Sequence, residues 1–96
     1  MADAAAFECV CDELERASSL DRLEARGTVR LALKQAGLEA RNVTVEQMRV
    51  ILEKVLPSEL ASRGIDRERM ICERITTGLE SAGLARIIRE EVAFLN

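Results

Sequence analysis

Apolar residues recur every three or four positions through most of this chain of 96 residues, as in helices that bury one face. The clearest series is Val45, Met48, Ile51, Leu52, Val55 and Leu56. No segment alternates with period two, and no Asn-Gly or Asp-Gly pair is present to close a β-hairpin. We therefore predict an all-α fold: a compact bundle of four to five short helices in a single domain, residues 1–96.

Serines and a glycine divide the first part of the chain. A first helical segment covers about residues 4–17, and Ser18 and Ser19 interrupt it. Either serine can cap the second segment, which covers about residues 20–36. Gly37 precedes an apolar residue, an order typical of a helix that stops with glycine in the left-handed conformation.

Further boundaries follow in the second part. Thr44 and Gln47 have the spacing of a capping box, which predicts a helix start. Pro57 should end or redirect that helix, because proline lacks an N–H group and clashes with the preceding turn. Residues 58–63 are expected to form one short turn, and Asp66 to cap the next helix.

The apolar register changes near Gly83. The preceding helix has its apolar face at Met70, Ile71, Ile75, Leu79 and Ala82. The series would next require an apolar residue at position 86, which is Arg86. We predict a break near Gly83 and a separate fifth helix, with one long helix as the alternative.

Charged residues indicate that the first two helices form an antiparallel αα-hairpin. Arg22, Arg26, Arg30 and Lys34 form a basic stripe with spacings of four, and Glu8, Asp12 and Glu15 share a face of the first helix. A hairpin folded at the two serines pairs Glu15 with Arg22, Asp12 with Arg26 and Glu8 with Arg30. In the same register Leu14 meets Leu23, Phe7 meets Leu31, and Gly27 is a notch for Cys11.

Two sets of residues are candidates for binding a partner. The basic stripe of Arg22, Arg26, Arg30 and Lys34 is either a set of intramolecular ion pairs, which we favour, or a surface for an acidic partner. Ile87, Ile88, Val92, Phe94 and Leu95 lie on more than one stripe at the C-terminal end of the sequence. They either complete the chain's own core, which we favour, or contact another chain.

The cysteines do not have the pattern of a metal or disulfide site. Cys9, Cys11 and Cys72 are few and odd in number, and the chain has no His. Residues 9 and 11 of a helix point about 200° apart, so they cannot share a metal ion. We expect no metal and no cofactor, with Cys11 and Cys72 as small buried residues; a redox role of Cys9 is the alternative.

The sequence contains little that would support catalysis. His, the commonest general base, is absent, and no phosphate-binding loop, nucleophile elbow or zinc-protease motif is present. We therefore predict that the chain is not an enzyme. A helix-turn-helix DNA-binding regulator is the main alternative function, but 14 basic and 17 acidic residues are mixed along the helices, so we do not expect nucleic acid as a partner.

The expected function is a small regulatory or protein–protein interaction module that acts through helix faces and associates with itself as a homodimer. A bundle with an aliphatic ligand pocket is a further alternative. The N-terminal residues lack a basic start and an apolar stretch, and no apolar run is long enough to span a membrane. We expect a cytoplasmic protein without membrane contact.

Overall fold

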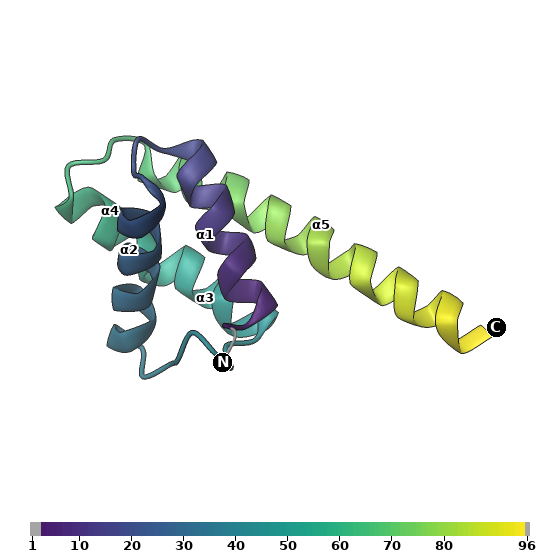
Figure 1. Cartoon of the computed structure of the whole chain (residues 1–96). Helices are drawn as coiled ribbons and strands as arrows, with labels where there is room; N and C mark the ends of the chain where they lie inside the picture. Colours follow the sequence, from purple (N-terminus) through teal and green to yellow (C-terminus); the bar gives the residue numbers. More distant parts are fainter. Residues whose placement is uncertain (1–2, 96) are drawn as a thin grey trace.

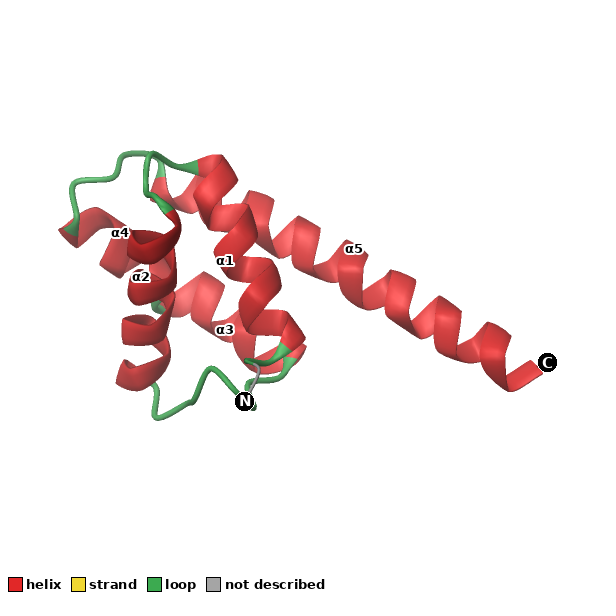
Figure 2. Ribbon diagram, in the orientation of Figure 1, coloured by secondary structure: helices red, strands yellow, loops and turns green. Residues whose placement is uncertain are grey.

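Helices account for most of the chain in the computed structural model, which describes the backbone of residues 3–95 and the side chains of residues 3–81. Over the described backbone there are five helices and no strand: α1 (Ala5–Ala17), α2 (Arg22–Gln35), α3 (Val45–Lys54), α4 (Leu56–Ser62) and α5 (Glu68–Leu95) (Figures 1 and 2). Helices α1, α3 and α4 pack on the first half of α5, and α2 packs on α1 and α4. The predicted all-α fold is confirmed.

The core is built almost entirely from aliphatic side chains. Leu14, Leu33, Leu52 and Ile75 come from four different helices and are almost completely buried. Phe7, one of only two aromatic residues in the sequence, is completely buried among them. Each such residue stabilises the fold by about 1.5–3 kcal/mol relative to full exposure, so the helices are held mainly by these contacts.

Two predicted helix ends are confirmed. Gly37 has a φ of 73°, its N–H donates to the Lys34 carbonyl at 3.1 Å, and the Leu38 N–H donates to the Leu33 carbonyl at 2.9 Å. These are the two hydrogen bonds of a Schellman motif. At the start of α3, the capping box is complete: the Gln47 N–H donates to Thr44 Oγ1 at 3.1 Å, and the Thr44 N–H donates to Gln47 Oε1 at 3.0 Å.

The predicted cap of α2 was wrong. The Ser18 hydroxyl donates to the Leu14 carbonyl at 2.6 Å, so Ser18 closes α1. Asp21 caps α2 instead: its Oδ1 accepts from the Glu24 N–H at 2.8 Å, and Glu24 Oε1 accepts from the Asp21 N–H at 3.2 Å. A carboxylate at this position also interacts favourably with the positive end of the helix dipole.

The boundaries around α4 and the start of α5 also differ from the prediction. Pro57 lies in the first turn of α4, where its missing N–H leaves no hydrogen bond unmade, so α4 begins earlier than residue 58. Asp66 is not the cap of α5, because that helix begins at Glu68. Arg67, with a φ of 61°, separates the two, and its carbonyl accepts the Ile71 N–H.

The predicted break near Gly83 is wrong, and the alternative of one long helix is correct. Helix α5 continues without interruption for 28 residues. A glycine inside a helix costs about 1 kcal/mol relative to alanine, which weakens a helix without ending it. The second half of α5 extends away from the other four helices (Figure 1).

Candidate functional site

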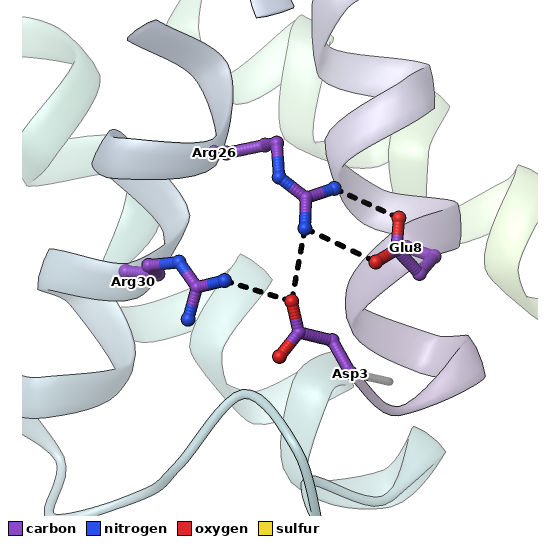
Figure 3. A network of polar contacts seen from close by, with 4 residues as sticks. All are labelled: Asp3, Glu8, Arg26 and Arg30. Atoms are coloured by element: carbon purple, nitrogen blue, oxygen red, sulfur yellow. Dashed lines mark hydrogen bonds and ion pairs between the residues drawn. The ribbon is translucent and has the colours of Figure 1, made fainter. Parts of the chain in front are cut away.

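The basic stripe lies along α2, and its members have different surroundings. Arg22 and Lys34, at its two ends, are exposed. Arg26 and Arg30 lie close to α1 (Figure 3). The guanidinium carbons of Arg26 and Arg30 are 5.2 and 4.9 Å from the centroid of the Phe7 ring, which is the geometry of cation–π interactions.

Both central arginines form ion pairs with acidic residues near the N-terminus. Arg26 Nη1 donates to Glu8 Oε2 at 2.8 Å, and Arg26 Nη2 donates to Glu8 Oε1 at 3.1 Å and to Asp3 Oδ2 at 2.9 Å. Arg30 Nη2 also donates to Asp3 Oδ2, at 2.7 Å. We call these four residues the Arg26 cluster (Figure 3). The hydrogen bonds from Arg26, followed by its charge, lower the pKa of Glu8 below its usual value.

The Arg26 cluster confirms that α1 and α2 pair through opposite charges, but the predicted register is wrong. Arg26 pairs with Glu8 rather than Asp12, a shift of about one helical turn. The backbone is extended at Ser18 and Asp21, so the connection does not bring the helix ends level. Asp3 precedes α1 and was missed, because only acids within the first helix were considered.

The predicted apolar pairs of the hairpin are also wrong. Leu23 is 81% exposed and Leu31 is 40% exposed, whereas the buried face of α2 consists of Ala25, Thr28, Val29, Ala32 and Leu33. A Cβ atom added at Gly27 would meet nothing within 4 Å, so Gly27 is not a notch for Cys11. The two alanines provide the small surface against which neighbouring helices pack.

The cysteines have the predicted structural surroundings. Cys11 and Cys72 are buried, and burial raises the pKa of each thiol to about 12. Cys9 is half-buried, and its pKa is raised by burial and by the negative charges of Glu13 and Asp12. A raised pKa disfavours the reactive thiolate. Among the described side chains, no group of three or more Cys, Asp or Glu residues could hold a metal ion.

The described half of α5 has two contrasting faces. Ile71, Cys72, Ile75 and Leu79 are buried against the bundle. Met70, Arg74, Thr77 and Ser81 lie on another face of the same helix and are exposed. Met70 is 60% exposed, which is high for a large apolar side chain beside the core.

The second candidate set, Ile87, Ile88, Val92, Phe94 and Leu95, lies outside the part of the chain whose side chains are described. Their positions in the helix are nevertheless defined, because α5 is continuous to Leu95. At about 100° per residue, these five positions fall within one arc of about 160°. The centre of this arc is roughly half a turn from the face that Ile71, Ile75 and Leu79 bury.

This change of side explains the altered register near Gly83. The apolar positions of α5 leave the face that packs on the bundle and continue on the opposite face of the same helix. The sequence signal for the change was correct, and only its interpretation as a break was wrong.

A hollow of about 570 Å³ lies where the turn between α1 and α2 meets the start of α5. Leu20, Ile65 and Met70 contribute apolar surface to it, and Arg67 and Arg74 contribute positive charge. The hollow is open to solvent and is next to the exposed face of α5 that begins at Met70.

No helix of the described residues combines the length and the apolar character needed to cross a membrane. Comparison of the chain with protein-family models, with curated proteins and with solved structures finds no match in any of the three.

Proposed function

We propose that this chain is a non-catalytic protein–protein interaction module that associates through the second half of α5, with self-association as the expected form. The observation that carries the proposal is the path of α5. This helix leaves the bundle and continues to Leu95, while its apolar positions move to the face opposite the one that the bundle covers.

An apolar helix face outside its own core gains stability when another protein covers it. Residues 84–95 include Leu84, Ile87, Ile88, Val92 and Leu95, and each large aliphatic side chain contributes about 1.5–3 kcal/mol when it is fully buried. Recognition of an amphipathic helix by an apolar surface uses residues spaced by three and four positions, as these are.

The basic stripe of α2 supports an acidic partner less well. Arg26 and Arg30 already pair with Asp3 and Glu8, so a partner would have to displace these carboxylates. Arg22 and Lys34 are exposed, and Lys34 lies at the C-terminal end of α2. The main surface proposed for binding is therefore on α5.

The proposal can be tested with two aspartate substitutions in α5. Ile88→Asp should leave cooperative thermal unfolding intact and reduce the molar mass in solution towards 10.6 kDa, measured by light scattering. Ile75→Asp is the matched control on the buried face, and it should abolish cooperative unfolding because it buries a charge.

Deletion of residues 92–96 is an independent test. If the intact chain is a dimer and the variant is a folded monomer, the deleted residues contribute to the interface. Loss of the folded state would place these residues in the chain's own core and overturn the proposal, and so would a monomeric intact chain that retains no protein partner.

A further inference from the structure

One exposed face can be followed through the described side chains of α5, and its spacing continues in the sequence to Leu95. Its described members, Met70, Arg74, Thr77 and Ser81, are spaced by four, three and four residues and are all exposed. Positions 84, 88, 91 and 95 continue the same alternation. We call these eight positions the α5 seam: Met70, Arg74, Thr77, Ser81, Leu84, Ile88, Glu91 and Leu95. Alternate spacings of three and four are typical of helices that pair along their length.

The chain cannot cover this seam with its own bundle. The bundle packs on the face of α5 that contains Ile71, Ile75 and Leu79, whereas Met70 and Thr77 are exposed on another face. The α5 seam extends for about 38 Å along a continuous helix, so its two ends cannot fold onto each other. The other described helices leave the described members of the α5 seam exposed to a second molecule.

We propose that a second copy of this chain covers the α5 seam in antiparallel orientation, with Arg74 of each copy opposite Glu91 of the other. This proposal rests on the proposed function and names its partner. The register then pairs Met70 with Leu95, Arg74 with Glu91, Thr77 with Ile88 and Ser81 with Leu84, each pair occurring twice by symmetry.

Charge selects this arrangement over its competitors. A parallel pair in register would place Arg74 against Arg74 and Glu91 against Glu91, and like charges at such positions repel. An antiparallel pair shifted by seven residues would place Arg74 opposite Leu84, and Glu91 opposite Arg67, which precedes α5 and is not part of the α5 seam. Only the proposed register joins the acid and the base of the α5 seam at both ends.

The hollow beside Met70 provides a second argument for this register. In the antiparallel pair, residues 94 and 95 of the second copy arrive at Met70, and these residues are Phe and Leu. The hollow of about 570 Å³ has apolar surface from Leu20, Ile65 and Met70. The apolar end of the second copy would therefore meet the apolar part of a hollow whose lining also includes Glu24 and Asp66, and Arg74 of the same hollow would lie near the position of Glu91.

Charge reversal tests the register directly. The dissociation constant of the dimer is measured by sedimentation for the intact chain, for Arg74→Glu, for Glu91→Arg and for the double variant. Each single variant should weaken the dimer by at least about tenfold, because it creates two like-charge contacts. The double variant should restore most of the affinity. Arg86→Glu is the matched control, because it makes the same change in charge as Arg74→Glu at a helix position on the side of α5 opposite the α5 seam. It should leave the dissociation constant within about threefold of that of the intact chain.

The outcomes separate the two proposals. Circular dichroism should show the same helix content in all variants, because Arg74 is exposed. The antiparallel register is overturned if neither single reversal weakens the dimer, or if the double variant does not restore its affinity. Either result leaves the proposed interaction function in place. A monomeric intact chain overturns the second copy as the partner.

Discussion

At the scale of single residues, Arg26 connects the packing of the hairpin to its electrostatics. Its guanidinium group contacts Asp3 and Glu8 and lies over the ring of Phe7, so one side chain joins the N-terminal residues, α1 and α2. Glu8 is 41% exposed, and solvent therefore screens much of this interaction. The pairing orients the helices more than it stabilises them.

Replacement of Arg26 by methionine should make stability less dependent on pH in the acidic range. The pKa of Glu8 is lowered in the folded protein, so its ionised form contributes stability above the usual value of 4.5, and this contribution is lost as pH falls through the lowered pKa. The Tm difference between wild type and Arg26→Met should therefore be largest near neutral pH and should decrease below about pH 4.5. Arg41→Met, at an exposed pair with Glu39, is the control and should change Tm little at any pH. A constant Tm difference for Arg26→Met would contradict the role of Glu8.

At the scale of helices, short-range signals in the sequence located several ends correctly. The capping box at the start of α3 and the Schellman motif at the end of α2 depend only on hydrogen bonds within a few residues. The sequence is therefore sufficient to predict them from Thr44 with Gln47 and from Gly37 with Leu38. Ser18 was assigned to the wrong helix because a hydroxyl can bond both backward and forward: here it donates backward to the Leu14 carbonyl, and its oxygen accepts from the Leu20 N–H, which lies before α2. The long α5 was predicted only as the alternative, because a change of apolar face resembles a break.

The glycines within helices offer a test at this scale. Gly27→Ala should stabilise the protein by about 0.5–1 kcal/mol, because alanine favours a helix and the added Cβ meets nothing within 4 Å. Gly78→Ala should gain less, because its Cβ would lie 3.2 Å from Cδ of Glu13 and the side chain of Glu13 must move. Chemical denaturation measures both. An equal or larger gain at Gly78 would contradict the close packing of α1 on α5.

At the scale of the whole molecule, a small bundle carries a helix that is longer than the bundle can cover. The molecule measures 50 Å in its longest dimension and 26 and 22 Å in the others, and α5 accounts for this elongation (Figure 1). A domain of this size buries a limited fraction of its surface, so association with a second chain would add substantially to its stability.

The thermal stability of the intact chain should therefore depend on its concentration. If a dimer forms along the α5 seam, Tm should rise by several degrees over a hundredfold increase in protein concentration, because association stabilises the folded state by mass action. Arg74→Glu should show a weaker dependence in the same scanning-calorimetry series. A Tm of the intact chain that does not vary with concentration would contradict self-association.

Apolar periodicity and local capping by themselves determined that this chain is helical, where several helices begin and end, and that the apolar face of the last helix changes near Gly83. Tertiary structure alone decided the rest. It selected Asp3 and Glu8 as the partners of Arg26 and turned Leu23 towards solvent. The physical reason is range: caps and periodicity act within a few residues, whereas register and burial depend on how surfaces from distant parts of the chain fit together.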